Sequence, residues 1–344
     1  MTGKRTTSLD VARLAGVSRS VVSAVINGTQ GIGVSSVKRE AVLRAMHELN
    51  YHVDAGARAM KTGRSNCIAA FGDMSNLLFL QLIEGIQQAS ARLGYHVLLV
   101  GQHGEGETAR EELISLYLQR RVDGIISLDH LGYQNETWME WVREHDIPYI
   151  SVEGYAKTDV VCSVLADYYG SVQTALEYMT QEQSEPPVFF QLEDDSSSNW
   201  AEEARLAAYY DFCEVNGIQP EVCTVHYNNK VIIRELLELR IQQGSSMVFL
   251  TNWMSAAIQF YRAAAELGLR IGRDLKVMSA DNTFRVSHHL HPKLSVMAVP
   301  YQEMGAKALE LLDQRINQEA PESNKGEMAA NYWVKARLIP GDSD

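Results

Sequence analysis

The chain has 344 residues and a formal net charge of −12, and this length predicts two or three domains. Its longest apolar runs are of strand length, so we expect no membrane-spanning helix. The N-terminus shows no apolar leader core, and the four cysteines match no zinc or disulfide pattern. We therefore expect a cytoplasmic protein rather than a membrane or exported one.

The charge is divided unevenly along the chain. Residues 1–64 contain ten Lys/Arg and four Asp/Glu, which gives +6, whereas the remainder contains 21 and 39, which gives −18. A basic segment can neutralise the phosphates of a nucleic acid, and an acidic one is repelled by them. The N-terminal segment is therefore the expected place for any contact with nucleic acid.

Residues 9–26 predict two short helices around a tight turn. Gly16 supplies the turn, and Ser18 is placed to cap the second helix. The side chains spaced to share one small core are Val11, Ala15, Val17, Val22 and Val25. This pattern predicts a helix-turn-helix, whose second helix enters the DNA major groove. An ordinary helical hairpin is the alternative for this segment taken alone.

A third amphipathic helix is predicted over residues 38–50, with Ser35 or Ser36 as its cap. The side chains expected to cover the first two helices are Val42, Leu43, Met46 and Leu49. Residues 54–61 predict a short hinge helix, and residues 62–65 a linker.

From residue 66 onward, strand and helix patterns alternate. Strands are predicted over residues 67–72, 95–101, 124–128, 148–152, 187–192, 222–227, 247–251, 275–279, 294–299 and 331–338. Helices are predicted over residues 78–93, 108–121, 138–144, 168–180, 200–216, 230–243, 255–267 and 302–317. This alternation predicts parallel sheets covered by helices on both faces, with a ligand cleft at the carboxyl ends of the strands.

The predicted organisation is an all-α DNA-binding domain over residues 1–53, a hinge and linker over residues 54–65, and an α/β core over residues 66–344. The core divides into two Rossmann-like subdomains. We expect the first to comprise residues 66–164 and 299–328, and the second residues 165–298 and 329–344.

The sequence resembles the LacI/GalR (lactose-repressor) family of bacterial transcription factors over nearly its whole length. The matching motifs lie at residues 10–18, 25–28, 49–51, 57–60, 122–126, 268–274 and 303–305. The resemblance implies a helix-turn-helix head, a hinge helix and a core like the periplasmic sugar-binding proteins. It also implies a homodimer that acts as a repressor in the cytoplasm and whose operator affinity is set by a small molecule in the cleft.

The chain departs from the family pattern at several positions. Val21 and Ala24 stand where the recognition helix often has threonine and arginine, and Met60 replaces the usual leucine of the hinge. The hinge helix opens with Val53 and Asp54 instead of Pro-Asn, and tryptophan at position 253 replaces an aspartate. We expect these differences to change which operator sequence and which effector the protein binds, and not the class of protein to which it belongs.

The candidate DNA-binding residues lie on the recognition helix and the hinge. Arg19 and Ser20 open the helix and are expected at base edges. The residues expected at phosphates are Ser18, Ser23 and Asn27. In the minor groove we expect Ala57 and, as a wedge between base pairs, Met60, whereas Lys61 is expected at a phosphate or at the groove edge. A polar outer helix face and a flexible linker are the alternatives.

The candidate effector-binding residues follow predicted strands. They are Ser75, Asn76, Phe79, Arg205, Asn252, Trp253 and Asp281. The resemblance assigns the anchoring role to Arg205, whose fork of donors suits hydroxyls, carboxylates or phosphates. Trp253 could stack on a sugar face, as could Trp200, Tyr133 and Tyr155, although packing in the core or rim explains these aromatic residues equally well. The expected effector is a carbohydrate.

Neither a catalytic site, a metal site nor a cofactor is predicted. His288, His289 and His291 lack the further ligands of a metal centre, and we interpret them as part of a polar loop. Two other functions share the predicted core: a sugar-binding transport receptor, which the helix-turn-helix argues against, and an enzyme, because fold does not fix function.

Overall fold

The computed structural model describes residues 6–27, 34–52, 59, 62–101, 107–130, 133–158, 161–181, 187–193, 199–226, 232–317 and 331–344. The chain separates into two compact units, the head (residues 1–65) and the core (residues 66–344).

The described part of the head is built from helices α1 (Ser8–Leu14), α2 (Arg19–Asn27) and α3 (Ser36–Glu48). The residues that pack together in its interior are Val11, Ala12, Val22, Val25, Val42 and Ala45. Ser35 caps α3 by accepting a hydrogen bond from the backbone of Lys38. Leu43 is not part of the interior and is 51% exposed. The reason is helical periodicity, because residues 42, 45 and 46 define the inner face of α3 and residue 43 falls outside it.

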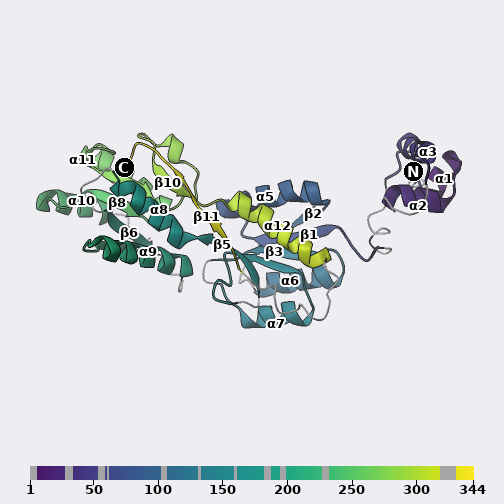
Figure 1. Ribbon diagram of the computed structural model, residues 1–344, viewed down its shortest axis with the longest axis horizontal. Coiled ribbons are helices and arrows are strands. Elements are labelled where there is room, and N and C mark those ends of the chain that lie inside the picture. The colour runs from purple at the N-terminus through teal and green to yellow at the C-terminus, as the bar shows by residue number, and fades with distance from the viewer. Residues whose placement is uncertain are drawn as a thin grey trace. The chain divides into compact units, whose positions relative to one another are not determined.

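The core contains two sheets that lie side by side (Figure 1). Among the described residues, the first runs in the order β11-β5-β4-β3-β1-β2, and we call it with its helices the N-subdomain. Its strands are β1 (Cys67–Gly72), β2 (His96–Gly101), β3 (Gly124–Leu128), β4 (Tyr149–Val152), β5 (Cys162–Asp167) and β11 (Tyr332–Lys335). Its helices are α5 (Leu77–Leu93), α6 (Glu107–Leu118), α7 (Glu136–Glu144) and α12 (Tyr301–Asn317).

The second sheet has the order β12-β10-β9-β8-β6-β7 in the described part of the chain, and with its helices it forms the C-subdomain. Its strands are β6 (Val188–Glu193), β7 (Val222–His226), β8 (Val248–Thr251), β9 (Lys276–Ser279), β10 (Ser295–Ala298) and β12 (Arg337–Ile339). Its helices are α8 (Tyr168–Thr180), α9 (Trp200–Asn216), α10 (Ile232–Gln243), α11 (Met254–Leu267) and the short 3-10 turn η1 (Ser287–His289).

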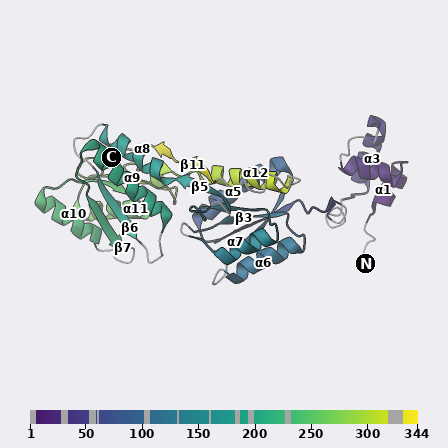
Figure 2. The ribbon, with the colours of Figure 1, turned by 60° about the horizontal axis from the view of Figure 1, so that its bottom comes forward.

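Both sheets are covered by helices on both faces, as the alternation predicts. Along β1, Ile68 and Ala70 pack beneath α5 and α12, whereas Ala69 and Phe71 pack beneath α6 and α7. Figure 2 shows these helix pairs on opposite sides of the first sheet. In the C-subdomain, α10 and α11 cover one face of the sheet and α8 and α9 the other. The predicted fold class is therefore confirmed, with β12 as an antiparallel addition to β10.

Two features of the sheets differ from the sequence-based expectation. Strand β5 was not predicted, and it pairs in parallel with β4 and with β11, the strand at the end of the first sheet. The predicted strand at residues 331–338 is two strands, of which β11 joins the first sheet and β12 the second. Residues 332–335 therefore belong to the N-subdomain, contrary to the expected boundary at residue 329. The chain changes sheet at Ala336, because a single strand cannot pair with both.

Helices α5 and α12 cross at very close range, and two glycines make this possible. A Cβ atom at Gly85 would lie 1.8 Å from the carbonyl oxygen of Gln302, and one at Gly305 would lie 2.1 Å from that of Leu82. Helix α12 follows β10 of the C-subdomain directly in the chain. The crossing therefore fixes the point at which this connection between the subdomains enters the N-subdomain.

Candidate DNA-binding and effector sites

The turn of the head places α2 against α1. Gly16 has a φ of +63°, and the amide of Val17 donates to the carbonyl of Ala12 at 3.0 Å. The hydroxyl of Ser18 accepts a 3.4 Å hydrogen bond from the amide of Val21, which caps α2 as expected.

The start of α2 presents polar side chains to solvent. Ser18, Arg19 and Ser20 are exposed, and Ser23 is half-buried. Ala24, at the position where the family often has arginine, is only 4% exposed and is turned into the head. The side chain of Asn27 and residues Ala57, Met60 and Lys61 lie outside the described part of the chain.

The predicted effector residues after β1 organise the turn into α5. Asp73 accepts hydrogen bonds of 2.8 Å from both the amide and the hydroxyl of Ser75. Asn76 caps α5 by accepting from the amide of Leu78 at 2.9 Å. Phe79 is fully buried. The structure therefore gives all three residues a local structural role at the carboxyl end of β1.

Asn252 and Asp281 are almost fully buried and tie strand ends together. The amide group of Asn252 donates to the carbonyl of Leu192 at 3.0 Å and accepts from its amide at 2.9 Å, which joins the ends of β8 and β6. The carboxylate of Asp281 accepts from the amide of Met254 at 3.3 Å and from the amide and hydroxyl of Thr283. Their polar atoms are thus largely engaged within the C-subdomain.

Arg205 occupies an unusual environment. It is 0% exposed, and its guanidinium carbon lies 4.2 Å from the ring centres of both Tyr168 and Trp253. Among the described residues, none of its three side-chain nitrogens has a hydrogen-bond partner. Burying an unpaired cation is costly, and two cation–π contacts offset only part of that cost.

Glu153, which the sequence analysis missed, lies at the carboxyl end of β4. Its Oε1 accepts a 2.8 Å hydrogen bond from Tyr168, and its Oε2 is buried and has no partner among the described residues. Burial raises the pKa of Glu153 from 4.5 to about 7, against the opposing effect of the hydrogen bond from Tyr168. The backbone of Glu153 has a φ of +68°, which is costly for a non-glycine residue and is frequent at functional sites.

Tyr168 and Trp200 connect Glu153 to neighbouring helices. The hydroxyl of Tyr168 lies 2.9 Å from that of Tyr301 at the start of α12, and the indole of Trp200 donates to the carbonyl of Glu153 at 2.9 Å. Glu153 therefore belongs to the N-subdomain but is held by α8 and α9 of the C-subdomain. Its position immediately after a buried parallel strand was the available sequence signal.

A second polar cluster lies in the N-subdomain and was also missed. Asp129, just after β3, forms an ion pair with Arg110 of α6. The same carboxylate accepts from Ser127 at 2.6 Å, from Tyr149 at 2.9 Å and from Ser151 at 2.7 Å. Because every carboxylate oxygen is bonded, this cluster is a structural ion pair.

Three aromatic residues considered as sugar platforms, Tyr133, Tyr155 and Trp200, are packed within the core of the protein. Tyr155 is fully buried, and Tyr133 packs against it and against Arg110. Packing in the core explains both tyrosines. Trp200 also lines a pocket of about 360 Å³ between α8, α9 and β11. The residues around that pocket are Asp167, Tyr168, Tyr169, Trp200, Ala204 and Trp333.

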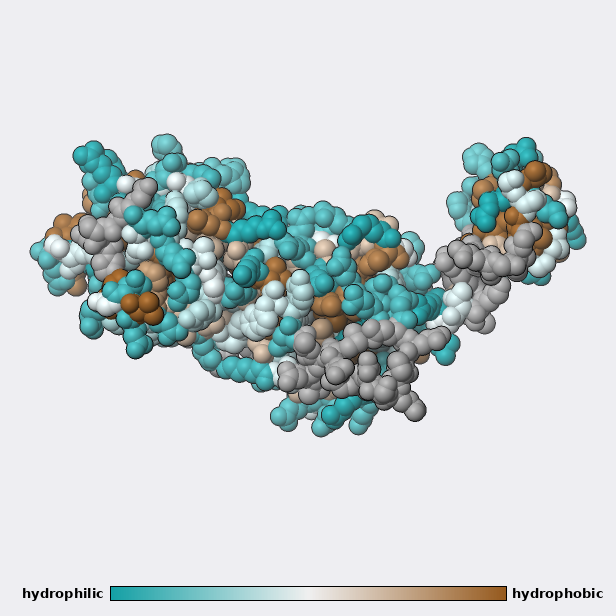
Figure 3. Space-filling model, in the orientation of Figure 1, coloured by the Kyte–Doolittle hydropathy of each residue, from teal (hydrophilic) through white to brown (hydrophobic). Residues whose placement is uncertain are grey.

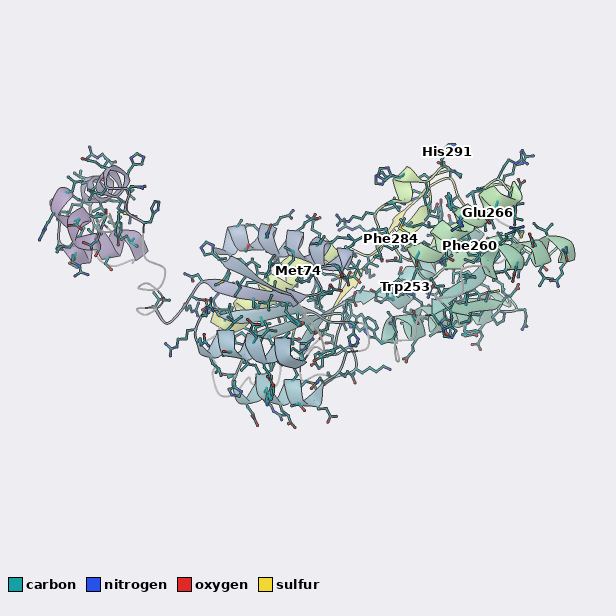
Figure 4. All side chains as sticks on the ribbon, turned by 180° about the vertical axis from the view of Figure 1, so that it is seen from behind. Met74, Trp253, Phe260, Glu266, Phe284 and His291 are labelled. Atoms are coloured by element: carbon teal, nitrogen blue, oxygen red, sulfur yellow. The ribbon has the colours of Figure 1, made fainter. Side chains whose placement is uncertain are left out.

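Trp253 lies at the start of α11, on the edge of the C-subdomain that faces the N-subdomain (Figure 4). Its indole donates to Oε1 of Glu202 at 3.0 Å. Figure 4 also labels Phe284 at this edge and Met74 on the N-subdomain. No group of three or more potential metal ligands occurs within the described ranges. No helix in those ranges is long and apolar enough to span a membrane.

Comparison with known proteins identifies both parts of the chain. Residues 7–54 match the family described as bacterial regulatory proteins, lacI family, and residues 187–343 match a periplasmic binding protein-like domain. Catabolite control protein A of Staphylococcus xylosus is 24% identical over 318 residues, which cover 91% of this chain and 93% of that protein.

Two solved structures share the fold over the full length. A lac repressor dimer bound to operator and the anti-inducer ONPF aligns with a TM-score of 0.74 at 22% identity, covering 99% of each chain. A complex of the transcriptional regulator CelR with cellobiose aligns with a TM-score of 0.61 at 21% identity, covering 99% of this chain and 100% of that one. A lacI-family DNA-binding domain over residues 7–54 is thus joined to a periplasmic-binding-protein-like domain over residues 187–343, which is the composition of a LacI-family DNA-binding transcriptional regulator.

Proposed function

We propose that this regulator is a repressor that binds operator DNA as a homodimer, and that a sugar or sugar derivative bound between its subdomains sets the operator affinity. The comparison proteins support this proposal, since one is a dimer bound to operator and another is a complex with cellobiose.

The proposed DNA contacts divide into base reading and positioning. Arg19 and Ser20 read base edges from the exposed start of α2, whereas Ser18, Ser23 and Asn27 contact phosphates. The segment 54–65 acts as the hinge. In it, Ala57 faces the minor groove, Met60 inserts between base pairs, and Lys61 contacts a phosphate or the groove edge.

Exposed leucines in the N-subdomain support the proposed dimer. Leu77 and Leu80 on α5 are 43% and 49% exposed, and Leu99 on the neighbouring strand β2 is 42% exposed. Figure 3 shows hydrophobic residues scattered over a mainly hydrophilic face of the protein. Strand β2 is at the edge of its sheet in the described part of the chain. A second copy that covers this region would remove the leucines from water.

The observation that carries the effector proposal is the buried guanidinium of Arg205 without a hydrogen-bond partner, next to the boundary between the subdomains. The ring of Tyr168 contacts this guanidinium. The hydroxyl of the same tyrosine donates a hydrogen bond to Glu153 of the other subdomain. The residues proposed to surround the ligand with Arg205 are Ser75, Asn76, Phe79, Asn252, Trp253 and Asp281. A ligand there shifts DNA affinity if it binds the DNA-bound and free conformations unequally.

The test selects an operator from a random DNA library and measures its affinity by fluorescence anisotropy with and without a panel of sugars. We expect a near-palindromic site, a dimer by sedimentation, and at least one sugar or derivative that changes the affinity. Arg205→Ala should keep operator binding and lose this response. A protein without sequence preference, or a monomer that binds the operator tightly, would contradict the proposal.

A further inference from the structure

The guanidinium of Arg205 is arranged to receive a ligand in its own plane. The guanidinium carbon of Arg205 lies 4.2 Å from the ring centres of both Tyr168 and Trp253. The N–H groups of a guanidinium point outward from its edges, in the plane. Because Nε, Nη1 and Nη2 have no hydrogen-bond partner among the described residues, the donors at this edge are left for a ligand. Carboxylates and phosphates match such an edge with two parallel hydrogen bonds.

Glu153 is a candidate counter-ion because the charge of Arg205 acts on its carboxyl group. Among the described residues, its Oε2 and the nitrogens of Arg205 have no hydrogen-bond partner, so the two side chains do not bond to each other. The groups that face Glu153 are the hydroxyls of Tyr168 and Tyr301, the backbone of Ala166 and the charge of Arg205. Burial favours the neutral carboxylic acid, which has one O–H donor to offer. With Oε1 occupied by Tyr168, that donor is at Oε2.

Within the described part of the chain, Arg205 therefore has no hydrogen-bonded counter-ion in a region withdrawn from water. A neutral sugar could accept hydrogen bonds from Arg205 through its hydroxyls, but it would leave this charge in place. A ligand with a carboxylate or phosphate compensates the charge and satisfies two or more donors at once. The same oxygens of the ligand, or a neighbouring hydroxyl, can accept the hydrogen bond that the protonated carboxyl group of Glu153 donates.

From these contacts we propose that the effector is a hydroxylated acid, whose carboxylate or phosphate binds the edge of Arg205 while Glu153 donates a hydrogen bond to the same ligand. This inference rests on the proposed function, because it names the class of ligand for the proposed effector site. Trp253, held by Glu202 at the start of α11, packs against Arg205 and would line the site on that side.

Calorimetry on the full chain with a set of related ligands tests the proposal. D-Galacturonate, its methyl ester and D-galactose differ chiefly in the charge at one carbon, and D-gluconate and D-glucose 6-phosphate distinguish carboxylate from phosphate as the preferred anion. We expect at least one acid to bind about ten- to a hundredfold more tightly than its ester or neutral sugar, the range for hydrogen bonds to a charged group.

Variants of Arg205 locate the effect. Arg205→Met should remove the preference for the acid. Arg205→Lys, which keeps the charge without the fork, should retain only part of it. Arg262→Met serves as the matched control, because Arg262 is an exposed arginine of α11 in an i,i+4 pair with Glu266, and it should bind ligands like the unmodified chain. Thermal unfolding and operator binding of each variant confirm that it is folded.

The outcomes separate this proposal from the proposed function. A preference for acids that disappears in Arg205→Met supports both. Equal binding of acid and ester, a preference that survives Arg205→Met, or binding by none of the acids would overturn the inference. If a neutral sugar nevertheless changes operator affinity, the effector-controlled repressor remains and only the class of ligand is wrong. If none of the ligands changes operator affinity, the proposed effector control itself is contradicted.

Discussion

The hydroxyl of Tyr168 donates a 2.8 Å hydrogen bond to Oε1 of Glu153 and thereby joins the first residue of α8 to the loop that follows β4. The two residues belong to different subdomains. Tyr168 stands where the chain passes from β5 of one sheet to α8 of the other, so this bond lies beside one of the connections about which the subdomains can rearrange. The same tyrosine ring contacts Arg205.

The buried carboxyl of Glu153 predicts a pH-dependent stability. Burial raises its pKa to about 7 from 4.5, so the folded chain binds this proton more tightly than the unfolded chain. The stabilisation is fully present below pH 4.5 and is lost as the pH rises through 7. The difference is on the order of 3 kcal/mol. Denaturant unfolding at pH 5.5 and pH 8 should show about 2 kcal/mol of this difference, and Glu153→Gln, which cannot ionise, should reduce the dependence. An unchanged pH dependence in that variant would contradict the assignment.

The ion pair of Arg110 and Asp129 predicts a large loss of stability when one partner is removed. Asp129→Ala leaves the guanidinium of Arg110 buried without its carboxylate, which typically costs about 3–5 kcal/mol. Asp274→Ala is the control, since Asp274 pairs with Arg270 in an exposed i,i+4 bridge and should matter far less. Urea unfolding monitored by circular dichroism measures both. Similar losses in the two variants would show that Asp129 is not the centre of a buried cluster.

The crossing of α5 and α12 predicts that Gly305 does not tolerate a methyl group. A Cβ atom there would lie 2.1 Å from the carbonyl oxygen of Leu82, so the helices must move apart in Gly305→Ala. Overpacking of this kind costs about 1–3 kcal/mol or more. Gln314→Ala, on an exposed position of the same helix, should stay within about 0.5 kcal/mol of the unmodified chain. If both variants unfold alike, the helices are not as close as described.

We expect a substitution of Arg19 to change the sequence preference of DNA binding rather than its general affinity. Arg19 is exposed at the start of α2, where side chains reach base edges. Arg19→Ala should relax the preference at one position of each half-site by about 1–3 kcal/mol. Binding to a set of single-base operator variants measures this. A uniform loss over all variants would identify Arg19 as a phosphate contact instead.

We expect the side chain of Met60 to bend the operator. The hinge segment of residues 54–61 is too short to be a stable helix alone in water, so we expect it to order when two copies meet on DNA. Met60→Gly should abolish bending and most of the specific affinity, because the apolar wedge is lost. Fluorescence transfer between labelled DNA ends measures the bend, and thermal unfolding of the variant should match the unmodified chain. Unchanged bending would refute the wedge.

Local patterns in the sequence determined the class of this protein. Apolar spacing around Gly16 predicted the head, and Val11, Val22 and Val25 are buried in it. The alternation of strand and helix signals predicted the doubly covered sheets. Both follow from periodicity, because each segment's apolar face reports how it is buried whatever its partner is.

Tertiary structure decided which segments meet. Strand β5 escaped prediction because it runs directly into α8 without a turn that would mark its end, and it is recognisable only from its pairing with β4 and β11. The division of residues 331–338 between two sheets likewise depends on which edges are available.

The same holds for the candidate effector site. The sequence indicated Arg205 as a donor, but its isolation depends on Tyr168 and Trp253, and the role of Glu153 depends on burial by α8 and α9. The sequence determines the chemistry of each side chain. Its desolvation and its hydrogen-bond partners are properties of the packed chain, because they are set by residues that are distant in sequence and adjacent only after folding.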